Sequence, residues 1–492
     1  MASHGQQNRG QYVQPGSEAA GGRFGRMFPT VAPREATGLA KAEEFGLPGG
    51  KVDGGETTEE QLSTVLDSGF TYFGQFVDHN VTFDPTSMLG QEVDPKALRN
   101  FRPPRLDLDN VYGGGPVVNE YLYDPESKGT KLALDPGGHD FARTGNDIAL
   151  IGDPRNDENL LIAQFHLAVI KFHNRVVDDL RSGQITDVLG AGFPAQPADP
   201  PDDVEGAKLD DLLALEDYYG DLLRKAQQVT RWHYQWILHR QFLPQIVGTD
   251  LIEDITENGL RFYDPGEQPF IPVEFAVAGY RFGHSTIRSR YQVNAEFAAD
   301  LFPLDPEADE QPRSDLRGGP VRPEHAVDWR YFFQIDPEIE AAKAKRLEAK
   351  LNRRLLDLPV RAVPGAREGA LPSQLGSLVV RNLLRSEAQE LPSGQDIARK
   401  IGEIPLTDEE LDSEGPIYLW YYLLKEAEVL HGGRQLGPVG GRIVAETLIG
   451  ILQADPASYL SVFPRWEPNI GGAGSEFGIA DFLTYAGVVP KR

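Results

Sequence analysis

Residues 152–180 read GDPRNDENLLIAQFHLAVIKFHNRVVDDL, and this stretch decides the fold class. Apolar side chains recur every three or four residues, at Leu161, Phe165, Ala168, Phe172 and Val176. That spacing predicts a long amphipathic helix. We expect the helix to begin near Asn156 or Asp157, because carboxylates such as Asp157 and Glu158 suit the positive end of the helix dipole.

The rest of the chain is also mainly helical in pattern. Helix-like spacing is found at 62–66 (after a capping box from Thr57 to Glu60), 73–79, 209–242, 273–287, 337–357, 373–386, 416–430 and 438–454. Pro244 is expected to end the helix that begins near residue 209. Residues 84–150 and 190–206 are typical of loops, and strand-like alternation is scarce. We therefore predict a mainly α fold, a large single-domain helical bundle with very little strand.

The ends of the chain suggest its organisation. Residues 1–55 combine glycine, proline and charge with weak periodicity, which predicts an N-terminal arm, partly extended or disordered, before a main domain at 56–492. No run of about 18 apolar residues is present, so we expect no transmembrane segment. Residues 1–50 lack an apolar segment behind a basic start, which indicates no secretory signal. A cytoplasmic location is the default expectation, and export without a classical signal stays open.

Composition narrows the chemistry. The 492 residues include no cysteine, which excludes disulfides, iron–sulfur clusters, thiolate-ligated haem and cysteine-based zinc sites. The formal net charge is −26, so the chain should repel nucleic acid and anionic membranes at long range. A small or neutral substrate is easier to accept than a polyanion.

Two groups of polar residues could face a common site. On a helix, Gln75 and His79 share a face and Asp78 lies beside them, so an amide, a carboxylate and an imidazole surround one point and could shuttle protons. At the start of the helix after residue 152, Arg155 could project a fixed cation into a cavity. Each group by itself also fits a commonplace role, as a satisfied core histidine or an exposed arginine.

Two later groups suggest a bound cofactor. His284 follows Gly283, whose missing side chain would let a flat cofactor approach, and Arg281 lies about one turn earlier on the same side. Asn382 sits in an apolar stretch, where it could accept a hydrogen bond from the outer nitrogen of a ligating histidine. His166 and His173, two helical turns apart, are too far apart for a zinc pair and are interpreted as core residues.

Taken together, the order and spacing of these residues resemble the animal-type haem peroxidases of the peroxidase–cyclooxygenase superfamily, over about residues 60–470. Residues 74–79 are similar to the distal motif of that family, residues 152–158 to its distal arginine loop, and residues 280–284 to its proximal motif. Residues 423–446 look like the bacterial branch in particular. The resemblance implies a helical bundle that encloses haem b.

The resemblance also implies roles around the iron. His284 would be the proximal iron ligand, with Asn382 bonded to its other ring nitrogen. His79 would be the distal acid–base, and Arg155 would stabilise the charge that develops as the O–O bond breaks. Gln75 would help hold water or halide near the iron.

Further implied contacts involve the haem periphery. Arg281 and Arg385 would face the propionates. Asp78 and Glu158 match carboxylates that form ester bonds to haem methyl groups in many relatives, and we predict both bonds here. Asn159 replaces the methionine of a third covalent link, so that link cannot form. The family's usual arginine–acid–histidine stretch is also missing after Arg385.

The calcium site of the family is altered. Relatives use an aspartate directly after the distal histidine and a loop with carboxylate and hydroxyl ligands, whereas the candidate ligands here are Asn80, Arg105, Asp107 and Asp109. Hard oxygen ligands remain among them, so calcium binding stays open.

The resemblance implies an oxidoreductase that reduces hydrogen peroxide, oxidises a halide, pseudohalide or small phenolic donor, and responds to oxidative stress. One alternative is a haem fatty-acid dioxygenase. Those enzymes carry a radical-forming tyrosine three residues before the proximal histidine, where this chain has Arg281, and Tyr280 is expected to point elsewhere. The other alternative is a scaffold protein without haem. The presence of Gln75, His79, Arg155, His284 and Asn382 argues against it.

Overall fold

The computed structural model describes residues 22–83, 99–197, 209–266, 269–302, 313–359 and 376–489. These residues are mainly helical with a few short strands, which confirms the predicted fold class. Their buried apolar side chains form one continuous core. Parts of the predicted arm (1–21) and of the predicted loops (84–98 and 198–206) lie outside the described residues.

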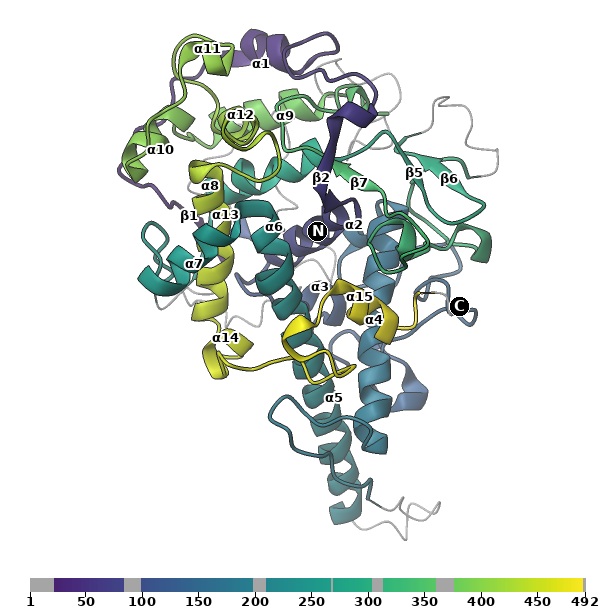
Figure 1. Cartoon of the computed structure of the whole chain (residues 1–492). Helices are drawn as coiled ribbons and strands as arrows, with labels where there is room; N and C mark the ends of the chain where they lie inside the picture. The colour runs from purple at the N-terminus through teal and green to yellow at the C-terminus, as the bar shows by residue number, and fades with distance from the viewer. Residues whose placement is uncertain are drawn as a thin grey trace, which may run out of the picture.

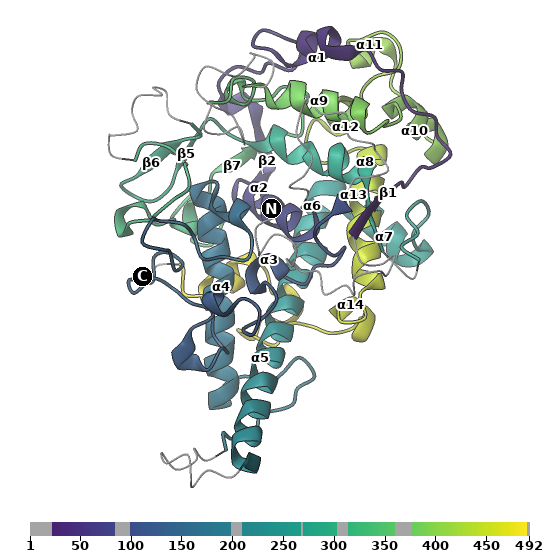
Figure 2. The ribbon, with the colours of Figure 1, turned by 180° about the vertical axis from the view of Figure 1, so that it is seen from behind.

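The longest helices form the centre of the molecule, and shorter ones cover it (Figures 1 and 2). Helices α2 (Gly69–Val81), α4 (Leu160–Ser182), α13 (Pro438–Ala454) and the consecutive α5 (Leu209–Ile237) and α6 (Leu243–Val247) pass through the body, and α12 (Leu419–His431) packs at one end of it. The covering helices are α1 (Gly38–Gly46), α3 (Asp109–Tyr112), α7 (Thr249–Asn258), α8 (Val273–Val277), α9 (Leu378–Ala388), α10 (Gly394–Ile401), α11 (Asp408–Leu411), α14 (Tyr459–Val462) and α15 (Ile479–Tyr485). The far end of α5 projects beyond the body in both views.

Helix α4 sets the position of α2. Asn159 caps α4 by accepting a hydrogen bond from the backbone N–H of Ile162 at 3.0 Å, so the helix begins close to the predicted place. The ring of Phe165 packs edge-on against Phe73 and Phe76 of α2, with centroids 5.7 and 5.1 Å apart. The apolar face read from the sequence therefore anchors the helix that carries the Gln75–His79 pair.

The strands form three small sheets. Their bounds are β1 (Gly22–Gly25), β2 (Leu62–Asp67), β3 (Arg99–Asn100), β4 (Ile271–Pro272), β5 (Arg290–Gln292), β6 (Ala298–Asp300) and β7 (Lys343–Lys345). Strand β1 lies between β3 and β4, while β2 pairs with β7 and β5 with β6, both antiparallel.

Two predicted helices are wrong. Residues 62–66 lie in strand β2, and residues 337–357 contain β7 and a short 3₁₀ helix, Arg353–Leu355. The capping box is real but is formed by Thr58 and Gln61, and it begins a single 3₁₀ turn. Pairing of β2 with β7, more than 270 residues away, overrides a local spacing that fits either structure.

Two other helices have unexpected ends. The long helix does not stop at Pro244, because a π-helical turn, Leu238–Phe242, follows α5 and α6 continues to Val247. A wider turn accommodates a residue that lacks an N–H. The predicted helix over 273–287 is split after α8 at Ala278, whose φ of −131° and ψ of −62° are not helical. A 3₁₀ helix, Gly279–Thr286, follows and carries His284.

The described part of the predicted arm packs on the body. Phe28 and Phe45 are 1% and 0% exposed, and the Glu274 carboxylate accepts hydrogen bonds from the backbone N–H groups of Met27 and Phe28. The boundary at residue 55 stays a prediction.

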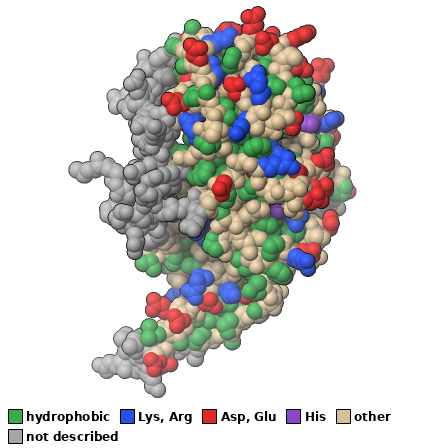
Figure 3. All heavy atoms as spheres, turned by 90° about the vertical axis from the view of Figure 1, so that its left-hand side faces the viewer, with side chains coloured by type: hydrophobic (Ala, Val, Ile, Leu, Met, Phe, Trp, Pro, Cys, Tyr) green, Lys and Arg blue, Asp and Glu red, His purple; other side chains and the backbone are tan. Residues whose placement is uncertain are grey.

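No helix among the described residues is long and apolar enough to cross a membrane. Acidic and basic side chains lie side by side over much of the face in Figure 3.

Candidate active site

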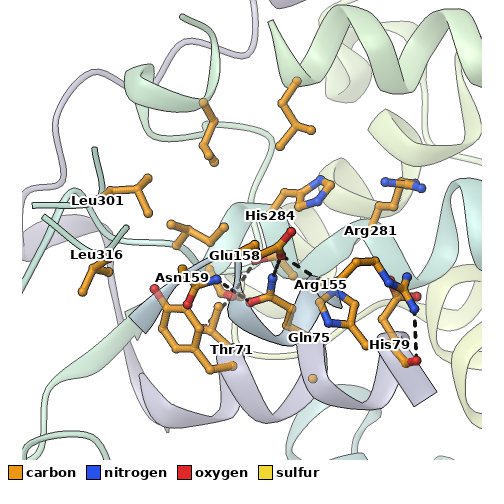
Figure 4. Close-up of a pocket in the computed structure, with 18 of the residues that line it drawn as sticks. Thr71, Gln75, His79, Arg155, Glu158, Asn159, Arg281, His284, Leu301 and Leu316 are labelled. Carbon is orange, nitrogen blue, oxygen red and sulfur yellow. Dashed lines mark hydrogen bonds and ion pairs between the residues drawn. The ribbon is translucent and has the colours of Figure 1, made fainter. Parts of the chain in front are cut away.

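A cavity of about 780 Å³ lies between α2 and the 3₁₀ helix Gly279–Thr286. That volume is in the range of sites for cofactors and small ligands. The polar lining residues include Thr71, Gln75, Asp78, His79, Arg155, Asp157, Glu158, Asn159, Arg281, His284, Thr286, Asp315, Arg317 and Arg381. Leu301 and Leu316 line an apolar side, away from Arg281 and Arg155 (Figure 4). The cavity thus brings together most of the residues singled out in the sequence.

His79 is held by a buried relay of polar side chains. Its Nδ1 lies 2.7 Å from Oδ1 of Asn156, and Nδ2 of Asn156 lies 2.9 Å from Nδ1 of His166. Because an amide oxygen only accepts, His79 must carry its proton on Nδ1, which leaves Nε2 as a base. Burial, and then Arg155, lower the pKa of His79 to about 4, so the ring is neutral near pH 7.

Arg155 is positioned from behind. It lies in the 3₁₀ helix Pro154–Asp157, which Asp153 caps. Its Nη2 donates to the carbonyl oxygens of His79 and Thr82 at 3.0 and 2.6 Å and to Oδ2 of Asp153 at 2.8 Å. Arg155 also lines the cavity. Burial opposes the charge of Asp153, yet Arg155 and Arg102 hold its pKa well below the ordinary value.

Gln75 and Glu158 meet beside His79. Nε2 of Gln75 donates to Oε1 of Glu158, and the same oxygen lies 3.7 Å from Nε2 of His79. Asn159 donates to Oε1 of Gln75 at 3.3 Å. Although 48% of the Glu158 side chain is accessible from the cavity, desolvation raises its pKa to about 7. A carboxyl that titrates near neutrality therefore lies within reach of the neutral imidazole.

His284 lies on the other wall (Figure 4). Its Nδ1 is 3.1 Å from Nδ2 of Asn382, and Oδ1 of Asn382 is 3.5 Å from Nη1 of Arg281. The predicted Asn382–His284 pair is therefore present, but the amide presents its nitrogen rather than its oxygen to the ring. Burial, and then Arg281, lower the pKa of His284 to about 3. A neutral imidazole is the form that binds a metal, but with Nδ2 of Asn382 facing Nδ1 the ring proton lies on Nε2, so iron binding through Nε2 requires the amide turned over, with Oδ1 accepting from Nδ1–H.

Three arginines gather at one end of this wall. Arg281 and Arg381 line the cavity, and Arg385 lies one turn beyond Arg381 on α9. Burial, followed by the like charge of Arg385, lowers the pKa of Arg281 to about 10 and also lowers that of Arg381. Nε of Arg381 has no hydrogen-bond partner among the described residues. Such a group of cations favours an anionic ligand.

The sequence predicted that Tyr280 points elsewhere. This prediction is wrong, because Tyr280 lines the cavity. It stacks on Phe275 with ring centroids 4.7 Å apart, and its buried hydroxyl has no hydrogen-bond partner among the described residues. The expectation assumed one continuous α-helix, whereas the helix breaks at Ala278, two residues before Tyr280, and Tyr280 lies in a separate 3₁₀ helix.

The candidate calcium ligands do not form a metal site. Nδ2 of Asn80 donates to Oδ1 of Asp107 and of Asp109, both at 3.3 Å, so it presents a donor where a cation needs oxygen. The side chain of Arg105 is about half exposed and lies 4.0 Å from Asp455. No group of three or more histidine, aspartate or glutamate side chains in the described part of the chain could hold a metal ion.

Comparisons with known proteins agree with this geometry. The model of the animal haem peroxidase family matches residues 90–305. The chain is 21% identical over 364 residues to a peroxidasin homologue of Caenorhabditis elegans, covering 68% of this chain and 24% of that protein. It is 22% identical over 287 residues to thyroid peroxidase of Mus musculus, covering 54% and 27%. The chain spans about a quarter of the length of these relatives.

Solved structures show the same fold. Peroxidase A of Dictyostelium discoideum aligns over 99% of this chain and 98% of its own, with a TM-score of 0.58 at 14% identity. A fatty acid alpha-dioxygenase of Arabidopsis thaliana aligns over 93% and 74%, with a TM-score of 0.54 at 14% identity. The match of residues 90–305 to the family model and the two peroxidase relatives make the chain similar to the animal haem peroxidases, and the solved structures share its fold. Assignment to a bacterial branch stays a prediction.

Three residues of the site were not singled out in the sequence. Asn156 orients His79, Arg381 joins the cationic group, and Arg102 contacts Asp153. Asn156 and Arg381 directly follow and precede residues that were singled out, so neighbouring polar residues were the available signal. Nothing in the local sequence marks Arg102, since its partners come from other segments.

Proposed function

We propose that the protein is a haem-dependent peroxidase that reduces hydrogen peroxide and oxidises a halide, a pseudohalide or a small phenolic donor. The observation that carries the proposal is a single cavity with two neutral histidines of different surroundings. His79 has Arg155 and Glu158 beside it, whereas His284 has Asn382 and the cations Arg281 and Arg381. One histidine is thus suited to move protons, and the other to bind iron.

The residues on the His284 wall fit haem b. A Cβ built on Gly283 would meet no atom within 4 Å, so this glycine borders open space that a flat ring could fill. Arg281 and Arg381 supply cations for the two propionates, and Arg385 adds a third nearby. When bound, the haem iron would exchange electrons with peroxide and with the donor.

The chain's own residues would handle protons and charge. Nε2 of His79 accepts a proton from peroxide and returns it to the leaving oxygen, because Nδ1 is occupied by Asn156. Arg155 places positive charge where negative charge develops, and its contacts with Asp153 and α2 hold it there in advance. Gln75, bonded to Glu158, orients water or halide at the same end of the cavity.

Asp78 and Glu158 are proposed to bind haem covalently. Both carboxyls line the cavity, and Thr82 donates to Oδ1 of Asp78 at 3.0 Å, which fixes one oxygen and leaves the other for bonding. Each carboxyl would hold the haem by an ester between one of its oxygens and a haem methyl carbon, and hydrogen peroxide, reduced to two molecules of water, would be the two-electron oxidant that each such bond needs.

A second candidate is a haem fatty-acid dioxygenase, which Tyr280 favours because its unpaired hydroxyl lies at the cavity wall. Oxygen uptake with a long-chain fatty acid, lost in a Tyr280→Phe variant, would support this candidate. Arg281, at the position of the radical tyrosine in those enzymes, favours the peroxidase.

The test is an absorption spectrum of the haem-supplied protein before and after peroxide. We expect a ferric Soret band that shifts on peroxide addition. The band should be lost in His284→Ala and kept in the control His431→Ala, whose histidine lies at the end of α12 and not among the cavity residues. Equal haem binding by His284→Ala, or none by the unmodified protein, would contradict the proposal.

A further inference from the structure

Arg102 is a fully buried cation behind the candidate active site. Its exposure is 0%, and it follows strand β3 in a loop remote from the catalytic motifs in sequence. Its Nη2 pairs with Oδ2 of Asp153, and its Nη1 lies 2.8 Å from Oδ2 of Asp109. Both carboxylates are themselves buried. One guanidinium therefore compensates two buried acids from different segments.

The neighbouring loop is arranged around this guanidinium. Asn80 donates through Nδ2 to Asp107 and Asp109, and its Oδ1 accepts the backbone N–H of Leu108 at 3.3 Å, which fixes the orientation of the amide. Leu108 has a φ of +61°, a strained conformation for leucine that brings the flanking aspartates to one side. The two oxygens of Asp109 thus contact Asn80 and Arg102, and a divalent cation would lie against a guanidinium.

We propose that Arg102 is an internal cation that replaces a metal ion at this site, and that it positions Arg155 through Asp153. Asp153 is the shared partner. It accepts from the backbone N–H and Nε of Arg155 through Oδ1, at 2.9 and 3.2 Å, and from Nη2 of Arg155 through Oδ2. The same Oδ2 contacts Arg102.

The ring of Phe83 completes the link. The guanidinium carbons of Arg102 and Arg155 lie 5.6 and 4.7 Å from its centroid. Loss of Arg102 would leave Asp153 and Asp109 without this cation. Asp153 would then attract Arg155 more strongly and move it away from the cavity. This positioning role rests on the proposed function, whereas the replacement of a metal ion does not.

The first test needs no variant, haem or peroxide. We expect no stoichiometric calcium in the purified full-length protein by elemental analysis, and the same Tm with and without a chelator. Calcium at one ion per chain, or a Tm that falls with chelator and recovers with calcium, would overturn the replacement of the metal ion by Arg102.

The second test compares Arg102→Met with Arg399→Met, a control that removes an arginine in an exposed ion pair with Asp396 at 2.7 Å. We expect Arg102→Met to lower the Tm by about 3–5 °C and the control to change it little. If Arg102→Met does not fold, Arg102→Met/Asp109→Asn removes one stranded acid and should fold. A Tm for Arg102→Met equal to that of the control would refute the internal cation.

The positioning role is tested by rescue. In Arg102→Ala, millimolar guanidinium chloride should restore the Tm and, in the haem-supplied protein, the rate of reaction with peroxide, whereas sodium chloride should restore neither. If guanidinium restores the Tm but the variant has no effect on the rate with peroxide or on its pH profile, the positioning of Arg155 is refuted and the internal cation is kept. If the unmodified protein does not react with peroxide, the proposed function fails, and the calcium and Tm results still decide the internal cation.

Discussion

Replacement of Asn156 by aspartate should change how the rate of reaction with peroxide depends on pH. The pH at which the rate falls on the acid side of the profile should move upward. The side chain is buried, and its oxygen lies 2.7 Å from Nδ1 of His79. A carboxylate at that place stabilises the charged imidazole and raises its pKa by about 1 to 3. The sign follows from the role of the ring: His79 accepts a proton only while neutral, so a higher pKa removes the base at low pH.

The size of the effect follows from the pKa of His79, which is about 4. With that value about nine tenths of the ring is neutral at pH 5, and with a pKa of about 6 about one tenth is neutral. The rate constant with peroxide at pH 5 should therefore fall about tenfold, while the rate near pH 8 should change little.

The assay is the rate of the absorbance change on mixing haem-supplied protein with peroxide, from pH 4 to pH 8. Asn174→Asp is the matched control, because Asn174 lies on α4 and bonds to the backbone of Leu132, away from the cavity. An acid limb that stays at the same pH in Asn156→Asp, or that moves equally in Asn174→Asp, would refute the assignment of Asn156 and His79.

Three further predictions concern the cofactor and stability. Gly283→Leu should lower the haem content without lowering the Tm of the haem-free protein, whereas Gly192→Leu, also without neighbours within 4 Å, should change neither. Glu158→Gln should make haem more easily extracted by acid–acetone; unchanged extraction would exclude its ester. The Tm should fall as the pH drops from about 6.5 to about 4, because the buried histidines bind protons less readily in the folded protein than in the unfolded chain. A Tm that does not change over this range would contradict the prediction. Their pKa values, all lowered by burial to about 3 or 4, belong to His79, His166, His173, His233, His239 and His284. Glu158 and Glu426 act in the opposite direction between about pH 4.5 and about pH 7 or 8, because burial raises their pKa values to about 7 and about 8, so above about pH 6.5, where the histidines are neutral in both states, the Tm should fall as the pH rises to about 8.

Local pattern predicted the elements that pack by one apolar face. The helix around Phe165 and the helix α13 lie where their spacing placed them, since burial of a 3.6-residue stripe needs no information from distant segments. The same pattern failed at 62–66 and 337–357, where long-range pairing of β2 and β7 decided the conformation. Tyr280 was misplaced because the local spacing gave no sign of the break in the helix at Ala278.

The sequence by itself determined the class of fold and the identities of most of the polar residues proposed to act in the cavity, because motif spacing and residue type are local properties. Tertiary structure alone decided how these residues act. It placed Asn156 between two histidines, gathered Arg281 and Arg381 on one wall, and paired Arg102 with acids 7 and 51 residues away. The physical reason is that pKa, tautomer and charge compensation depend on burial and on partners brought together by folding, and neither is encoded in any single segment.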